Sequence, residues 1–183
     1  MRLWRVLPWD PSAAAGAPGD ALWIPRAFQG TARHDNPDRY GCLYLAEDAV
    51  SAVAETLAPF RGTGGLRPEL LMRSGRQLAL AELELDAGAV LVDLDAPAVL
   101  AAEALRPSIV ATSRRAVTQA YAVRQFERHP DAAGLRWWST LEASWIHVTL
   151  FDRALGGVTV QSMQALVVDD EAVTIAAAHL GLA

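Results

Sequence analysis

An alternation of apolar and acidic residues near the middle of the chain places the strongest constraint on the fold. In LALAELELD (78–86), every second residue from 79 to 85 is apolar, whereas Glu82 and Glu84 fall on the other face. Side chains of a strand point alternately to opposite faces of its sheet. The pattern therefore predicts a strand with one buried face. A second strand, AVLVDLD, is predicted directly after it at 89–95.

Shorter apolar runs and turn residues predict the remaining elements. Further strands are expected at 3–7, 42–46, 134–139, 145–152 and 165–168. Helices are expected at 48–57 (capped by Asp48), after an Asp95 cap with Pro97 in the first turn, from Ser113 to about Arg128, and from Asp170. The polar, turn-rich segment 26–40 is expected on the surface or around a pocket.

The order of these elements indicates the fold class. Helices and strands are intermixed without a regular βαβ repeat, which predicts an α+β fold with a mixed or antiparallel sheet and flanking helices. No internal repeat or domain boundary is visible, so residues 1–183 are predicted to form a single domain. With 52% apolar and 20% charged residues, a chain of this size buries a core without disulfides or metals.

The charged residues exclude several kinds of chemistry. All 16 basic residues are arginine, so no lysine can form a Schiff base. The Gly-rich segment GTGGLRP (62–68) also lacks the lysine of a phosphate-binding Walker loop. The net charge of -5 and the pI near 5.3 argue against nucleic acid as a primary ligand, because backbone binding needs a positive surface.

Cysteine and histidine give no support for a metal centre. Cys42 is the single cysteine, so neither an internal disulfide nor a Cys-rich metal site can form, and the strand position of Cys42 favours a core role. The four histidines lack metal-ligand spacing, and no G-x-S-x-G or G-x-G-x-x-G motif occurs.

The first residues do not form a secretory signal, and no 18-residue apolar run is present. We therefore expect a cytoplasmic protein that does not bind membranes.

Four polar residues stand out because they flank predicted apolar elements. Arg33 lies in ARHDNP, Tyr44 in CLYLA, Glu55 in VSAVAETL and Ser139 in GLRWWST. Arg33 and Tyr44 are separated by the same number of residues as Tyr44 and Glu55. Glu55 projects away from the apolar stripe of the 48–57 helix. Two interpretations of Glu55 stay open: a solvated glutamate, or a carboxylate that lines a cleft beneath the 26–40 segment.

Four motifs in order give the chain a family resemblance. They are ARHDNP, LYLAEDAVSAVAE, GLRWWS and VTLF, and the similarity runs from about Trp4 to Phe151. The chain resembles the RES-domain family, which is named for its arginine, glutamate and serine. Members of that family are toxins of bacterial toxin–antitoxin pairs.

The resemblance implies a fold and an activity. The fold is expected to be similar to that of ADP-ribosyltransferases. The expected reaction is cleavage of the nicotinamide–ribose bond of NAD⁺, with water or phosphate as acceptor, so that NAD⁺ is a substrate and no cofactor is needed. Transfer of ADP-ribose to a protein, or NAD or ADP-ribose binding without catalysis, are the alternatives. The expected partner is an antitoxin with a DNA-binding domain, and the resemblance leaves homo-oligomerisation open.

The resemblance also implies roles for individual residues. Glu55 would stabilise the positive charge that develops on the ribose as nicotinamide leaves. Arg33 would hold phosphate oxygens with two parallel hydrogen bonds, and Arg5 would meet the other phosphate. Tyr44 would border the nicotinamide ribose, and Ser139 would hydrogen-bond the ligand.

Arg39 offers an alternative to Arg33 as the family arginine. Arg33 is preferred because about ten residues separate the family arginine from the strand tyrosine, whereas Arg39 lies only five residues before Tyr44. The residue after the family arginine is often aromatic, and His34 occupies that position here.

Overall fold

A computed structural model describes residues 1–182 of the chain. The contacts within it define two compact units. Unit 1 comprises Met1–Trp23, Ala46–Leu85 and the residues from Thr159 onward, and unit 2 comprises Ile24–Leu45 and Asp86–Val158. The assignment of residues 1–183 to a single domain stays a prediction.

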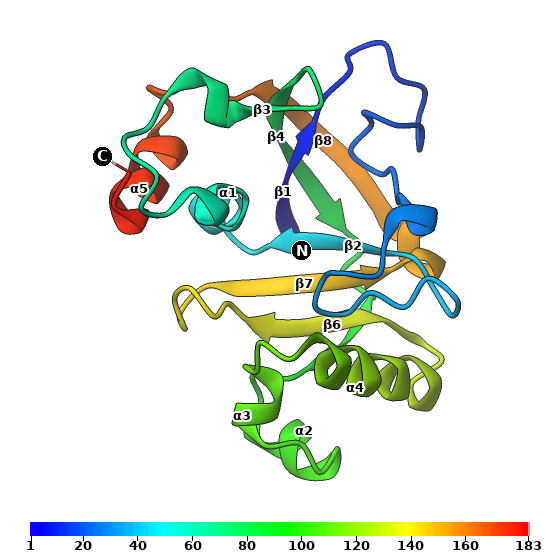
Figure 1. The fold of residues 1–183 in the computed structure, drawn as a ribbon. Coiled ribbons are helices and arrows are strands. Elements are labelled where there is room, and N and C mark those ends of the chain that lie inside the picture. The colour runs from blue at the N-terminus through cyan, green and yellow to red at the C-terminus, as the bar shows by residue number, and fades with distance from the viewer. Residues whose placement is uncertain (183) are drawn as a thin grey trace. The chain divides into compact units, whose positions relative to one another are not determined.

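The described residues contain short strands and helices in mixed order (Figure 1). The strands are β1 (Arg2–Pro8), β2 (Cys42–Ala46), β3 (Met72–Arg73), β4 (Arg76–Leu85), β5 (Val90–Asp93), β6 (Ala132–Trp138), β7 (Ile146–Phe151) and β8 (Val158–Ala165). The α-helices are α1 (Ala49–Leu57), α2 (Pro97–Ala102), α3 (Pro107–Val110), α4 (Arg115–Arg128) and α5 (Glu171–Leu180).

Unit 1 is built around the antiparallel pair β1 and β4, in which Leu3 lies opposite Leu83. Strand β4 also pairs with β3 and β8. Alternate residues of β4 from Ala79 to Leu85 are buried, whereas Glu84 is exposed, which confirms the alternation seen in the sequence. Helices α1 and α5 pack together, and α1 also packs on β1 (Figure 1). The buried face of the strands and the two helices therefore share one core.

Helix α1 begins where the sequence predicts. Asp48 has an extended backbone conformation, and its carboxylate Oδ1 accepts a hydrogen bond from the Ser51 N–H at 2.7 Å. This bond satisfies one of the backbone donors that the first turn of a helix leaves without a partner. The helix buries Val53, Ala54 and Leu57 on the face that its periodicity indicates.

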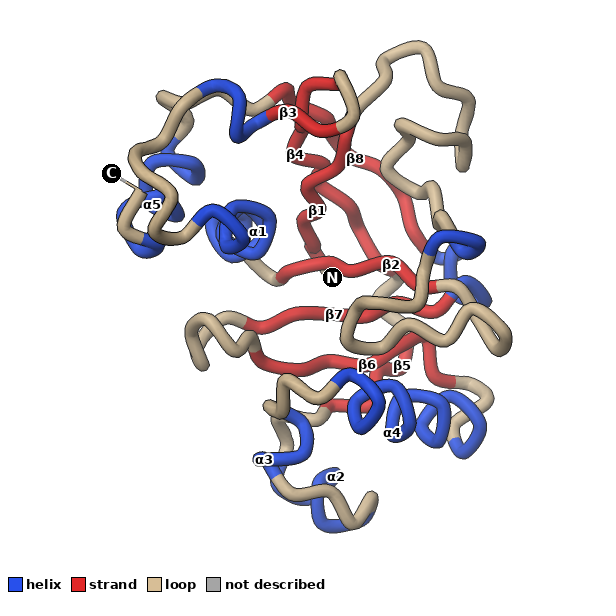
Figure 2. Tube along the Cα trace, in the orientation of Figure 1, coloured by secondary structure: helices blue, strands red, loops and turns tan. Residues whose placement is uncertain are grey.

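Unit 2 contains a mixed sheet in the order β2–β7–β6–β5. Strands β6 and β7 are antiparallel, whereas β5 runs parallel to β6. Gly134 in β6 comes so close to β7 that a Cβ atom there would lie 2.2 Å from the Thr149 carbonyl oxygen. Helix α4 runs alongside β6 in both ribbon and tube views (Figure 2). An aromatic cluster of Tyr40, Phe126 and Phe151 packs in the same unit, with ring centroids 4.7 to 5.1 Å apart.

The predicted α+β class with a mixed or antiparallel sheet and flanking helices is confirmed. None of the helices formed by residues 1–182 is long and apolar enough to cross a membrane.

Three local predictions are wrong. The strand expected at 165–168 is instead β8, which ends at Ala165, and most of its side chains are exposed. A strand of this kind lacks the apolar run on which the prediction depended. Helices α2 and α4 begin after Ala96 and Arg114, without a side-chain capping bond, and so neither Asp95 nor Ser113 is the cap.

The segment 26–40, which is expected on the surface or around a pocket, lies partly in the interior of unit 2. Arg33, His34, Asp35 and Tyr40 are buried. Burial is tolerated because these polar groups form hydrogen bonds inside the protein. The sequence shows that the segment is polar, but it does not show which residues form hydrogen bonds with these polar groups.

The cap of α1 gives a direct test of this part of the fold. We expect Asp48→Ala to lower the free energy of unfolding by about 1 kcal/mol, because the Ser51 N–H loses its acceptor. Urea denaturation followed by circular dichroism measures the change. As a control, Asp38→Ala removes the same charge from an exposed turn and should change stability by less than about 0.5 kcal/mol. Equal losses in the two variants would contradict the capping role.

Candidate functional site

The carboxylate of Asp35 organises the loop that carries the predicted arginine. Its Oδ2 accepts hydrogen bonds from the N–H groups of Gly30 and Ala32, both at 2.8 Å. Its Oδ1 accepts a hydrogen bond from the Tyr44 hydroxyl, also at 2.8 Å. One buried acidic side chain thus folds residues 30–35 into a compact loop and joins that loop to β2.

The imidazole of His34 joins the same loop to a strand and a helix. Nδ1 lies 2.7 Å from the Thr149 hydroxyl on β7, and Nε2 lies 2.8 Å from the Tyr121 hydroxyl on α4. The backbone N–H of His34 donates to the Tyr44 hydroxyl at 2.9 Å. A neutral imidazole has one donor and one acceptor nitrogen, and both are used here.

Burial keeps this imidazole neutral. His34 is fully buried, and the loss of hydration lowers its pKa well below the ordinary value of 6.5. The positive charges of Arg33 and Arg115 lower the pKa further. The Trp137 indole N–H donates to the same Thr149 hydroxyl at 3.1 Å, so the hydrogen-bond chain continues into β6.

The side chain of Arg33 lies in the interior of unit 2 and is 6% exposed. Its Nη1 donates to the carbonyl oxygens of Val110 and Thr112, at 2.8 and 3.0 Å. The guanidinium carbon lies 5.0 Å from the centre of the Trp137 ring, in a cation–π contact. The Arg33 carbonyl accepts a hydrogen bond from the Thr118 hydroxyl on α4. The arginine is therefore held in a fixed position by several elements.

Tyr44 lies at the junction of this network, because its hydroxyl accepts from the His34 N–H and donates to Asp35. Burial is the main cause that raises the pKa of Tyr44 well above 10.

Cys42, on the same strand, is buried, and burial is the main cause that raises the pKa of its thiol to about 12. A thiol with this pKa stays protonated at neutral pH and is a poor nucleophile. The core role predicted for Cys42 agrees with this burial.

Ser139 follows β6 and shapes the turn toward β7. Its backbone N–H donates to the Trp145 carbonyl at 2.7 Å, and its Oγ accepts from the Leu141 N–H at 3.0 Å. The residue is buried, two positions after the Trp137 ring that contacts Arg33.

The other two predicted residues belong to unit 1. Glu55 is exposed on α1, on the side away from the buried Val53 and Leu57, as the periodicity of the helix predicts. Arg5 lies in β1 and is half-buried, and its guanidinium donates to the carbonyl of Ala21.

Within unit 2, the structure therefore brings Arg33 and Tyr44 together through His34, and Trp137 connects Arg33 to the strand that leads to Ser139. Arg39, the alternative to Arg33, is exposed and forms an ion pair with Glu127. The two arginines therefore differ in burial, and the choice of Arg33 stays a prediction.

Sequence reasoning missed several polar residues of this network, above all Asp35, Tyr121 and Thr149. They lie in three different segments, and no local pattern connects them. His34 directly follows Arg33 and replaces the aromatic residue that often stands there in the family pattern. That substitution was the one sequence signal for a special environment.

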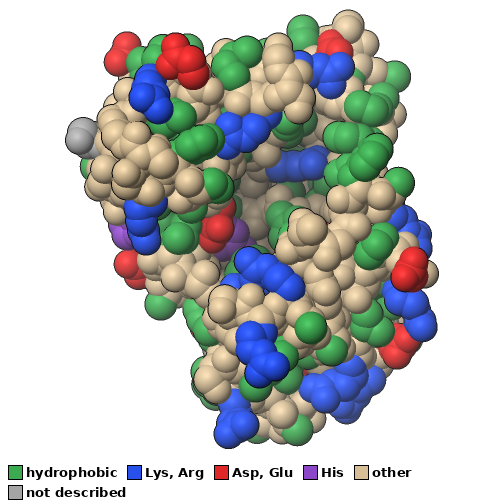
Figure 3. Space-filling model, in the orientation of Figure 1, with side chains coloured by type: hydrophobic (Ala, Val, Ile, Leu, Met, Phe, Trp, Pro, Cys, Tyr) green, Lys and Arg blue, Asp and Glu red, His purple; other side chains and the backbone are tan. Residues whose placement is uncertain are grey.

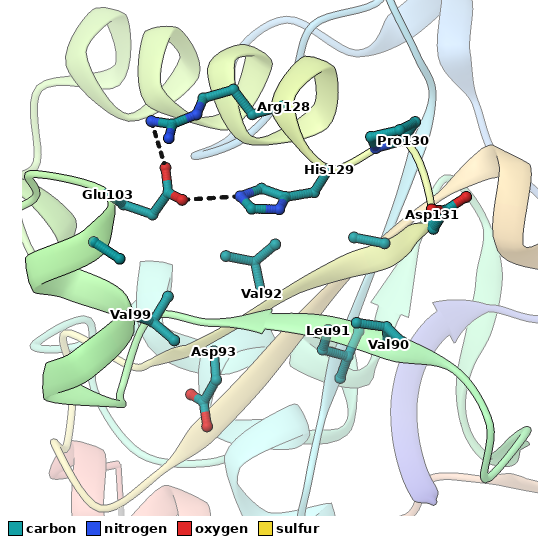
Figure 4. Close-up of a pocket in the computed structure, with 12 residues that line it drawn as sticks. Val90, Leu91, Val92, Asp93, Val99, Glu103, Arg128, His129, Pro130 and Asp131 are labelled. Atoms are coloured by element: carbon teal, nitrogen blue, oxygen red, sulfur yellow. Dashed lines mark hydrogen bonds and ion pairs between the residues drawn. The ribbon is translucent and has the colours of Figure 1, made fainter.

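A separate cavity of about 440 Å³ lies in unit 2 between β5 and the end of α4 (Figure 4). At the edge of this cavity, the buried Glu103 carboxylate accepts a hydrogen bond from His129 at 2.9 Å and forms an ion pair with Arg128 at 3.0 Å. Much of the remaining lining is apolar, and no predicted site residue belongs to it. Within residues 1–182, no group of three or more histidine, cysteine or acidic side chains is arranged to hold a metal ion.

Comparison with known proteins identifies the family to which this chain belongs. The RES domain model matches residues 2–174, and the chain therefore belongs to the RES domain family. No curated protein matches the chain.

A solved structure with a similar fold is the M. tuberculosis MbcT–MbcA toxin–antitoxin complex. The TM-score is 0.64 at 14% sequence identity, and the match covers 99% of this chain and 87% of the other. At this identity, the likeness concerns the fold.

The lowered pKa of His34 predicts a pH-dependent stability. The unfolded chain binds a proton at His34 below about pH 6.5, whereas the folded chain does not until a much lower pH. We therefore expect stability to be complete above pH 6.5 and to fall with decreasing pH, by up to about 1.4 kcal/mol per pH unit. Urea unfolding between pH 7.5 and 5 measures this slope.

Two variants assign the slope to one histidine. His34→Gln should lower stability at every pH but reduce the slope below pH 6.5, because no proton binds at glutamine. His179→Gln changes an exposed histidine on α5 and should leave the slope as it is. A slope that persists in His34→Gln would show that other groups cause the acid sensitivity.

Proposed function

We propose that this protein is a toxin of a toxin–antitoxin pair that consumes NAD⁺ by cleaving its nicotinamide–ribose bond. Membership of the RES domain family over residues 2–174 supports the toxin assignment. The observation that carries the chemical proposal is the buried guanidinium of Arg33, held against the Trp137 ring in a loop that His34 joins to Tyr44 and Tyr121. A rigid, permanently charged group of this kind suits recognition of a phosphate.

In the proposed reaction, the bond between the ribose C1 carbon and the nicotinamide nitrogen breaks, and the bond electrons leave with nicotinamide. The ribose gains positive charge as this bond lengthens. An oxygen of water or phosphate then bonds to the same carbon, and an attacking water releases one proton to the solvent. The products are nicotinamide and either ADP-ribose or its phosphorylated form.

We assign Glu55 to stabilise the positive ribose, because a carboxylate is the group that the developing charge requires. Arg33 and Arg5 would hold the phosphates, and Tyr44 would border the nicotinamide ribose. Ser139 would hydrogen-bond the ligand. The fixed hydrogen bonds around Arg33 and Tyr44 support these roles, since preorganised groups do not lose free energy by reorienting during the reaction.

The proposed partner is an antitoxin with a DNA-binding domain that neutralises this activity. A solved structure of similar fold is part of a toxin–antitoxin complex, which supports a partner of this class. Transfer of ADP-ribose to a protein is the second candidate activity, and the test below separates it from hydrolysis by omitting any acceptor protein.

The central test is the Glu55→Gln variant, which keeps the size of the side chain but removes its charge. We expect the rate of nicotinamide release from NAD⁺ to fall by about two to three orders of magnitude. Chromatography of nicotinamide and the ADP-ribose product, with purified protein, measures the rate with and without millimolar phosphate. Release that requires phosphate indicates a phosphorylase, and release without it indicates a glycohydrolase.

Glu69→Gln is the matched control, because Glu69 is also an exposed glutamate of unit 1. It should leave nicotinamide release unchanged. Full activity in Glu55→Gln would overturn the proposed mechanism. Binding of NAD⁺ without any nicotinamide release by the unmodified protein would instead indicate a non-catalytic module.

A further inference from the structure

An apolar groove of about 450 Å³ lies in unit 2 along helix α4, next to α3. Ala116, Ala120 and Arg124 recur every fourth residue and so form one side of α4. Leu105 and Ile109 line the groove from the α3 side. The two alanines on α4 are exposed, and their small side chains leave room for another backbone to come close.

The surface around the groove is strongly basic. Residues 104–128 contain five arginines and one acidic residue, Glu127, although the whole chain carries a net charge of -5. The arginines are exposed: Arg106, Arg114, Arg115, Arg124 and Arg128. Figure 3 shows basic side chains in blue over the part of the surface where Figure 1 places α3 and α4.

Much of this positive charge is not neutralised within the described chain. Among residues 1–182, Arg106, Arg114 and Arg115 form no ion pair with a carboxylate, and Arg124 donates to the backbone carbonyl of Glu103. Glu127 is already paired with Arg39. An acidic ligand would therefore meet arginines whose charge is available.

We propose that this groove binds an acidic amphipathic helix of a partner protein. Apolar side chains of such a helix would enter the groove, and its aspartates and glutamates would pair with the flanking arginines. The lining residues of α4 extend from Ala116 to Arg124, which is more than two turns and suits an elongated occupant. Single-stranded nucleic acid fits less well, because it needs exposed aromatic rings for stacking, and Tyr121 in the groove is 4% exposed.

The groove is physically connected to the candidate site. The Tyr121 ring lines the groove, and the Tyr121 hydroxyl contacts the His34 imidazole. A helix bound in the groove would lie over α4, the helix whose Tyr121 hydroxyl contacts His34 in the loop of residues 30–35. The identification of this partner as the antitoxin rests on the proposed function, whereas the binding chemistry of the groove does not.

The test uses a designed helical peptide as the probe. It has 14 residues, the length of α4, with leucines along one face, glutamates elsewhere and a fluorescein label. A second peptide carries lysine in place of each glutamate. Fluorescence anisotropy with the full chain should show binding of the glutamate peptide and at least about tenfold weaker binding of the lysine peptide.

Matched double variants locate the binding surface. Arg106→Glu with Arg124→Glu should weaken binding of the glutamate peptide by about tenfold or more. Arg61→Glu with Arg67→Glu makes the same charge change at exposed residues of unit 1 and should alter the affinity less than about twofold. Ala120→Trp fills the groove and should also weaken binding, provided that its thermal unfolding matches that of the unmodified protein.

Three results would overturn the proposal. They are equal weakening in both double variants, equal binding of the two peptides, and displacement of the peptide by an equal concentration of a 14-nucleotide oligothymidine. Nicotinamide release is measured on the same proteins and should be unchanged in both double variants. If the unmodified protein releases no nicotinamide, the proposed function fails, while the anisotropy data still decide whether the groove binds an acidic helix.

Discussion

The buried carboxylate of Asp35 is the interaction on which the candidate site depends. A polar loop can enter the interior of a protein only if its backbone donors find acceptors. Asp35 supplies acceptors for Gly30, Ala32 and the Tyr44 hydroxyl. Once the loop is fixed, His34 reaches Thr149 and Tyr121, and Arg33 reaches Trp137. The order of these contacts explains how one short segment joins strands and helices of unit 2.

Local patterns in the sequence predicted those parts of the fold that local forces determine. The alternation in β4, the Asp48 cap of α1 and the α+β class all follow from residue spacing. Strand β8 escaped prediction because its pairing with β4, rather than an apolar face of its own, makes it a strand. Contacts between residues distant in sequence also limited the prediction of the site. The sequence indicated Arg33 and Tyr44, whereas Asp35, Tyr121 and Thr149 were found only in the three-dimensional structure.

The use of arginine alone for positive charge has consequences both in the interior and on the surface of the protein. In the interior, the guanidinium of Arg33 keeps its charge while two carbonyls and an aromatic ring surround it, an environment in which a lysine would tend to lose its proton. On α4, the same residue type produces a basic surface on a chain that is acidic overall. Net charge therefore describes only the average of the molecule and does not reveal a local basic surface such as that of α4.

The candidate site depends on Gly134 although this residue has no functional group, because β6 and β7 come very close together there. Any side chain there would collide with the Thr149 carbonyl and push β7 away from β6. The Thr149 hydroxyl forms hydrogen bonds with both His34 and Trp137. A displacement of β7 would therefore disturb the loop that carries His34. Gly134 is thus a position where a single added methyl group would disturb the candidate site without touching the proposed ligand, and random mutagenesis that selects for loss of the proposed activity should find it alongside the polar residues.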